Sequence, residues 1–86
     1  MEIEFDKNKS TSNKIKHGID FYEAQRLWED PERIIIPARS NNEVRFVMIA
    51  RIEEEYWSVI YTLRENVVRI ISVRKSRQNE KEIYQS

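Results

Sequence analysis

The sequence has no cysteine, one glycine, two prolines and one histidine among its 86 residues. The absence of cysteine excludes disulfide bonds, a thiol nucleophile and any metal site built on thiolates. A single histidine and scattered carboxylates have no spacing typical of a metal centre, so we expect neither a metal nor another cofactor. No apolar run approaches the roughly 20 residues that a membrane-spanning helix needs. The first residues lack the pattern of a signal peptide, and the expected location is the cytoplasm.

Charged residues are unevenly distributed, although the formal net charge is zero. Residues 64–77 contain five cations and one anion, and residues 7–17 contain four lysines and no acidic residue. Acidic residues gather elsewhere, for example at positions 53–55. A chain of this length is sufficient for one small domain, which we expect to span residues 1–86. The charge pattern predicts a basic surface and an acidic one, and a basic surface suits a polyanion.

Two helices are expected in the first third of the chain. Asp6 can cap a polar helix over residues 7–16, and Gly18 follows it in the position where a left-handed residue ends a helix. Apolar content in this first helix is low, which predicts a marginal helix on the surface. Asp20 and Glu23 have the spacing of a capping box for a second helix, whose apolar residues would face a sheet.

The remaining apolar segments alternate with polar residues and predict strands. We expect these strands at residues 2–5, 33–37, 44–51, 56–63 and 67–75. Residues 38–43 would form a polar turn and residues 53–55 a hairpin loop, and Ser76 or Asn79 would cap a C-terminal helix that ends near residue 84. The expected fold is therefore α+β, with a small antiparallel β-meander, two N-terminal helices packed on it and a C-terminal helix.

The segment of residues 67–77 combines β-branched side chains with four cations. Strict alternation along a strand places Arg69 on one face and Ser72 and Arg74 on the other. Arg69 and Arg74 can then line one site only if a bulge or twist intervenes. We favour Arg74, Ser72 and Lys75 as the centre of a polyanion site. The alternative is that these cations are strand-end charges that keep a sheet edge soluble.

Several short motifs resemble a known family when they are taken together in their order and spacing. The motifs are Lys16-His17-Gly18, Phe21, Ala24, Asp30-Pro31, Glu43-x-Arg45, Val59-x-Tyr61-Thr62, Arg69 to Arg74, and Glu80 to Tyr84. This set resembles the BrnT toxin family of bacterial type II toxin–antitoxin pairs, over residues 5–84. The sequence departs from the family pattern in its opening residues and at Lys81, where an arginine is usual. Neither departure removes a cation from the segment of residues 67–77.

The resemblance implies a compact RelE-like fold of the microbial ribonuclease type. It also implies RNA cleavage that halts translation, and neutralisation by a BrnA-type antitoxin. Because such antitoxins often pair as dimers, it suggests a two-plus-two heterotetramer in which only the antitoxin contacts operator DNA. No membrane partner is expected.

RNA can be cleaved by its own 2′-hydroxyl group, so an enzyme need only position the phosphate, move protons and stabilise negative charge. Arg45, Arg69 and Arg74 are candidates for this catalytic role, because a guanidinium can bind two phosphate oxygens at once. Ser72 can add a hydroxyl contact, and the imidazole of His17 can exchange protons near neutral pH. This chemistry requires no metal.

A further group of residues would bind RNA: Lys16, Lys75, Arg77, Tyr61 and Tyr84. A tyrosine ring can stack on an unpaired base, and the cations can bind phosphates. Structural alternatives exist, since His17 can interact with a helix end, Arg45 can form an ion pair in the hairpin, Tyr61 can lie in the core and Tyr84 can anchor a helix. The alternative function is a non-catalytic module that binds RNA or protein, or an inactive toxin relic that binds only its antitoxin.

Overall fold

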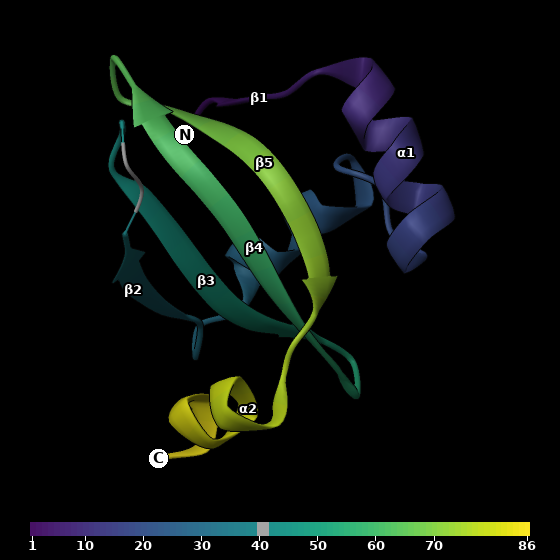
Figure 1. Ribbon diagram of the computed structural model, residues 1–86. Coiled ribbons are helices and arrows are strands. Elements are labelled where there is room, and N and C mark those ends of the chain that lie inside the picture. The colour runs from purple at the N-terminus through teal and green to yellow at the C-terminus, as the bar shows by residue number, and fades with distance from the viewer. Residues whose placement is uncertain (40–41) are drawn as a thin grey trace.

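The structure is a computed structural model that describes residues 1–39 and 42–86, and within these residues a five-stranded mixed sheet is combined with helices (Figure 1). In chain order the elements are β1 (Ile3–Glu4), α1 (Lys7–His17), η1 (Glu23–Glu29), β2 (Ile34–Ala38), β3 (Arg45–Ile52), β4 (Glu55–Arg64), β5 (Val67–Lys75) and α2 (Gln78–Gln85). Strands β2 to β5 form an antiparallel meander, and the order across the sheet is β1-β5-β4-β3-β2. The predicted α+β meander and the predicted order of elements are confirmed.

Strand β1 differs from the expectation, because it runs parallel to β5. Glu4 pairs with Arg69, and the N–H of Val68 donates to the carbonyl oxygen of Glu2 at 3.0 Å. The expectation of a purely antiparallel sheet is therefore wrong at this edge. Alternation within a strand shows which side chains share a face, but it does not encode the direction of the neighbouring strand.

The second helix, η1, is a 3₁₀ helix and not the expected α-helix. The capping box is present, since the N–H of Glu23 donates to Asp20 Oδ1 at 2.7 Å and the N–H of Asp20 donates to Glu23 Oε1 at 3.0 Å. Phe21, Ala24 and Leu27 are all buried and follow one another at intervals of three. A 3₁₀ helix has three residues per turn and therefore keeps all three on one face.

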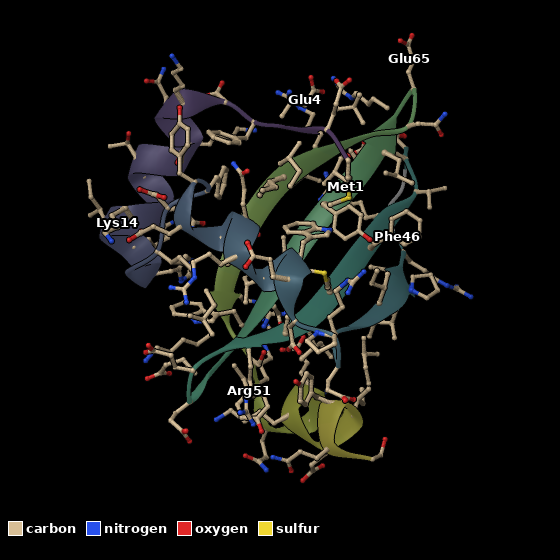
Figure 2. The ribbon with its side chains drawn as sticks, turned by 180° about the vertical axis from the view of Figure 1, so that it is seen from behind. Met1, Glu4, Lys14, Phe46, Arg51 and Glu65 are labelled. Atoms are coloured by element: carbon tan, nitrogen blue, oxygen red, sulfur yellow. The ribbon has the colours of Figure 1, made fainter. Side chains whose placement is uncertain are left out.

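The hydrophobic core lies between η1 and one face of the sheet. In Figure 2 this face is turned toward the viewer, with η1 in front of it. Its buried members from the strands are Met48, Ala50, Trp57, Val59, Tyr61, Val68, Ile70 and Val73. We call the opposite face the outer face. None of the described helices crosses its middle, and α2 lies at one end of it (Figure 1). Figure 2 places Arg51 at the end of the sheet near α2 and Glu65 at the other end.

Helix α1 is attached to the sheet edge by hydrogen bonds of polar side chains. Asn13 Oδ1 accepts from the N–H of Val73 at 3.2 Å, and Asn13 Nδ2 donates to the carbonyl oxygens of Val73 at 2.9 Å and Ile19 at 2.8 Å. Ser10 Oγ accepts from the N–H of Phe21 at 2.9 Å. Asn13 thus supplies the bonds that a neighbouring strand would otherwise give to the edge of β5. This explains how a helix with so little apolar surface is held in place.

The predicted cap residues are confirmed for α1, and the predicted N-cap residue of α2 is wrong. Asp6 Oδ1 accepts from the N–H groups of Asn8 and Lys9, and Gly18 ends the helix with φ +84°. Helix α2 instead has Arg77 at its N-cap position. The hydroxyl of Ser76 is engaged elsewhere, because it lies 2.8 Å from the hydroxyl of Ser58 in the interior.

The loops differ from the expectation in one detail. Strand β4 already begins at Glu55, so the hairpin turn consists of Glu53 and Glu54, with Glu53 at φ 56°. The predicted polar turn at residues 38–43 includes residues 40–41, which lie outside the described residues, and Ala38 belongs to β2. Among the described residues, no helix is long and apolar enough to cross a membrane.

We expect Asn13→Ala to lower the free energy of unfolding by about 2 kcal/mol, because it leaves the buried N–H and C=O groups of Val73 without their partners. Urea unfolding measures this difference. Thr11→Ala is the matched control, because the Thr11 side chain is exposed and donates to the Lys7 carbonyl oxygen of its own helix. Equal unfolding midpoints for the two variants would contradict this account of α1.

Candidate functional site

A β-bulge in β5 brings the cations of this strand onto one face. Ile70 pairs with Tyr61 and Ser72 pairs with Ile60, so Ile71 has no partner on β4. The alternation of side chains therefore shifts by one residue at Ile71. Val68 and Ile70 before the bulge and Val73 after it all lie in the core, and Arg69, Ser72 and Arg74 are left on the outer face. Strict alternation would have separated Arg69 from Arg74, and the bulge supplies the condition under which the sequence allowed both to share one face.

The register of the sheet adds Arg45 to this group. Thr62 on β4 pairs with Arg45 on β3 and with Arg69 on β5, so the two arginines flank one threonine across three neighbouring strands. Arg74 lies in a second row, opposite Ser58. Thr62 and Ser58 are four positions apart, which separates the two rows by roughly 13 Å at about 3.3 Å per residue.

Half-buried apolar side chains lie between the two rows on the outer face. They are Ile36, Val47, Ile60 and Ile71. The outer face therefore has an apolar centre with Arg45 and Arg69 on one side and Arg74 on the other. A surface of this kind can bind phosphates at its margins and the apolar parts of a partner at its centre.

Each of these arginines has an acidic neighbour. Arg45 Nε lies 3.1 Å from Glu43 Oε1, and Arg69 Nη1 lies 3.5 Å from Glu4 Oε1. Both pairs are partly exposed, so their contribution to stability is small and a phosphate can compete for the guanidinium. The expected alternative for Arg45, a hairpin ion pair, is thus present beside its position on the outer face.

Arg74 forms a more buried pair with Glu80 of α2. Arg74 Nη1 donates to Glu80 Oε1 at 2.8 Å, and Arg74 Nη2 donates to Glu80 Oε2 at 2.9 Å. These bonds, together with those from the Arg77 N–H and the Ser58 hydroxyl, lower the pKa of Glu80 to about 2, although burial acts in the opposite direction. The same pair raises the pKa of Arg74. Both groups stay charged across the physiological range.

A hollow of about 180 Å³ lies between α1 and β5, beside the bulge. It is lined by Lys9, Ser12, Asn13, Lys16, His17, Ile71 and Ser72. Lys16 and His17 of α1 therefore meet Ser72 of β5, which lies far from them in the sequence. Asn13 fixes this arrangement, because it bonds to Val73 directly after Ser72.

Two of the candidate cations, Lys75 and Arg77, lie apart from the hollow and from the arginines of the outer face. Lys75 points to the core side of the sheet, where its Nζ lies 5.9 Å from the ring centre of Trp57 and 3.5 Å from Glu55 Oε2. Arg77 is exposed at the start of α2, where its N–H donates to Glu80 Oε1 at 2.8 Å.

The two candidate tyrosines have structural neighbours in place of an open ring face. Tyr61 is 5% exposed, with ring centres of Phe46 at 5.4 Å and Trp28 at 5.7 Å, so it lies in the core. The hydroxyl of Tyr84 donates to Asp30 Oδ2 at 2.8 Å, and its ring meets Tyr56 edge-on. Burial and the bond to Asp30 raise the pKa of Tyr84 to about 12. Tyr84 thus anchors α2.

Sequence reasoning missed Glu80, Asn13 and Thr62 as parts of this region. The signal for Glu80 is its position three residues after Arg77, the spacing of a helix N-cap and its N3 residue. The signal for Asn13 is its spacing of three from Ser10 on a helix with almost no apolar face. Thr62 belongs to the motif Val59-x-Tyr61-Thr62, but its place between Arg45 and Arg69 follows only from the strand register.

The described ranges contain no group of three or more His, Cys, Asp or Glu side chains placed to hold a metal ion. The outer face and the adjoining hollow instead bring together guanidinium, ammonium, hydroxyl and imidazole groups. These groups can bind phosphate oxygens and exchange protons. The fold and the site thus define a small α+β domain with a cationic surface suited to a polyanion.

A family model described as the ribonuclease toxin BrnT of type II toxin–antitoxin systems matches residues 5–80. This range is most of the chain, and the chain therefore belongs to the BrnT family of ribonuclease toxins. The resemblance inferred from the motifs is confirmed. A toxin of this type has a cognate antitoxin as its partner. A search of curated proteins finds no match to this sequence.

The depressed pKa of Glu80 predicts a loss of stability in acid. A carboxyl group with a lower pKa in the folded than in the unfolded state stabilises the fold fully above about pH 5. This contribution, about 3 kcal/mol for a shift from 4.5 to about 2, disappears as the pH falls toward 2.

Glu80→Gln removes this titration, so its free energy of unfolding is expected to fall less between pH 6 and pH 2 than that of the wild type. Urea unfolding at a series of pH values measures the two slopes. Glu82→Gln is the matched control on the same helix, since Glu82 is exposed and accepts a hydrogen bond from Gln78 Nε2 at 3.5 Å. If the free energy of unfolding fell equally with pH in the wild type and in Glu80→Gln, the loss of stability in acid would not come from Glu80.

Proposed function

We propose that this BrnT toxin is a metal-independent endoribonuclease that halts translation by cutting RNA on the outer face of its single domain, residues 1–86. The observation that carries this proposal is the bulge at Ile71. It turns Arg69, Ser72 and Arg74 to the same face as Arg45, beside the hollow that contains His17. One RNA phosphate bound near Ser72 would thus have cations on either side of it.

The proposed reaction uses the 2′-hydroxyl of the RNA as the nucleophile. The bond from the 2′-oxygen to phosphorus forms, the bond from phosphorus to the 5′-oxygen breaks, and a cyclic phosphate and a 5′-hydroxyl result. One proton leaves the 2′-hydroxyl and another is given to the departing 5′-oxygen. Negative charge on the non-bridging oxygens rises in the transition state, and Arg69 and Arg74 would stabilise it.

His17 is the proposed group for one of these proton transfers, because an imidazole has one ring nitrogen that can accept a proton and one that can donate a proton. It lines the same hollow as Ser72, whose hydroxyl would contact a phosphate oxygen. Lys16 and Lys9 line this hollow as well and would bind the neighbouring phosphates of the strand. The burial of Tyr61 argues against a role in base stacking, so we leave it out of the proposed site.

An RNA cleavage assay with EDTA present tests this function. We expect purified toxin, freed of antitoxin, to cut a mixed-sequence RNA despite the chelator. Arg69→Ala, Ser72→Ala and Arg74→Ala should each reduce the rate, the arginine variants by about 100-fold. Arg26→Ala is the control, because Arg26 is exposed on η1 at the opposite side of the sheet.

Cleavage that EDTA abolishes would contradict metal independence. Cleavage that is unchanged in Arg69→Ala and Arg74→Ala would place the site elsewhere. Intact RNA from a folded wild-type protein calls for the same assay with translating ribosomes added. Intact RNA there as well would favour the non-catalytic binding module.

For the partner, we propose a BrnA-type antitoxin that covers the outer face with an acidic segment. The apolar centre of this face and the arginines at its margins fit an amphipathic acidic helix. An antitoxin dimer would then carry two toxins in a two-plus-two heterotetramer, and operator DNA would be contacted by the antitoxin alone. The molar mass of the purified complex in solution tests the stoichiometry.

The double variant Arg45→Ala, Arg69→Ala is expected to weaken antitoxin binding and to flatten its dependence on salt, because two partly exposed cations are lost from the interface. Binding isotherms at several salt concentrations measure both effects. The Arg26→Ala protein again serves as control. Unchanged affinity and an unchanged salt slope would show that the antitoxin binds another surface.

A further inference from the structure

Glu80 is held from three directions by the elements around it. Its Oε1 accepts from Arg74 Nη1 at 2.8 Å, from the N–H of Arg77 at 2.8 Å and from Ser58 Oγ at 3.0 Å. Its Oε2 accepts from Arg74 Nη2 at 2.9 Å. These donors come from β5, from β4 and from the start of α2. The carboxylate is only 10% exposed, so its orientation is set by the fold.

A second layer of hydroxyl groups supports this carboxylate. Ser58 gives its one hydroxyl proton to Glu80, so the 2.8 Å contact between the hydroxyls of Ser58 and Ser76 has Ser76 as the donor. Ser58 and Ser76 are both buried. The chain of bonds from Ser76 through Ser58 to Glu80 therefore adds a further restraint on the orientation of the carboxylate.

Each N–H group of the Arg74 guanidinium can be assigned either to an acceptor or to none. A guanidinium has five N–H groups, and Arg74 directs one from each Nη to Glu80. Nη1 also donates to the carbonyl oxygen of Lys75 at 3.3 Å. Within residues 1–39 and 42–86, the Nε–H and the second N–H of Nη2 have no acceptor. These two groups are adjacent and parallel, the arrangement that binds two oxygens of one phosphate.

We propose that Glu80 is a positioning residue of the ribonuclease, which binds Arg74 through its two Nη atoms and so keeps the Nε–Nη2 edge available for the scissile phosphate. Glu80 itself makes no contact with RNA. This inference rests on the proposed function, in which Arg74 contacts that phosphate. The side chain of Arg74 is 23% exposed, which leaves part of the guanidinium accessible on the outer face.

The opposite role for Glu80 makes the opposite prediction. A carboxylate that merely occupied the arginine would compete with RNA, and its removal would raise the rate of cleavage. A carboxylate that orients the arginine gives a loss of rate on removal, because a misplaced phosphate clamp costs about 100-fold.

The test is a double-mutant cycle of Glu80→Gln and Arg74→Lys, measured as kcat and KM for cleavage of the mixed-sequence RNA. We expect Glu80→Gln to lower kcat by about 100-fold with a small change in KM. In the Arg74→Lys background, which lacks the Nε–Nη2 edge, Glu80→Gln is expected to have no further effect on kcat. Glu82→Gln is the control and should cleave as the wild type does.

Ser58→Ala is a second variant for the case that Glu80→Gln fails to fold. It removes one bond to Glu80 and keeps the ion pair with Arg74. A smaller loss of kcat that also vanishes in the Arg74→Lys background would support the proposal. Thermal unfolding identifies the folded variants.

Additive losses in the cycle would overturn the proposal, because a purely structural effect does not depend on the arginine. A gain of activity in Glu80→Gln would overturn it in favour of competition with RNA. Full activity in Glu80→Gln together with an inactive Arg74→Ala would refute the role of Glu80 and leave the proposed function intact. Full activity in Arg74→Ala would instead remove Arg74 from the proposed function itself.

Discussion

The bulge at Ile71 is the constraint on which the outer face depends. A strand alternates its side chains strictly, so without the extra residue Val73 and Arg74 would exchange faces. Arg74 would then enter the core, and Val73 would lose its buried position beside η1. One unpaired residue thus keeps three apolar side chains of β5 in the core while three polar ones share the other face. The surrounding rows of arginines follow from this shift and from the strand register.

Several cations can lie close together on the outer face of a folded domain because a nearby carboxylate neutralises each arginine. Glu43, Glu4 and Glu80 each lie beside one arginine of the outer face, and each comes from a different part of the chain. The cations are therefore not left to repel one another in a half-buried region. This arrangement also explains how a chain of zero formal net charge can have a surface suited to RNA.

The sequence predicted what is determined locally. Asp6 and Gly18 identified the ends of α1, and the strand patterns identified all five strands of the sheet. Alternation did not reveal the bulge, because one unpaired residue leaves the composition of β5 unchanged. Asn13 escaped notice because periodicity detects apolar faces, whereas this side chain bonds to a strand edge. Cations on a strand predict only a site that binds a polyanion. The ribonuclease activity was predicted from the family motifs instead.

The position of α2 in the chain has a consequence for the cell that makes the toxin. Glu80 follows β5 in the sequence, so it leaves the ribosome after all five strands. Strand β1 also cannot join the sheet until β5 has been synthesised, because its partner β5 lies more than half of the chain further on. If Glu80 sets the orientation of Arg74 as proposed, the nascent chain has no oriented arginine while the sheet is being synthesised. The sheet would then form before the activity does, because Arg74 would gain its orientation only when α2 packs against β4 and β5.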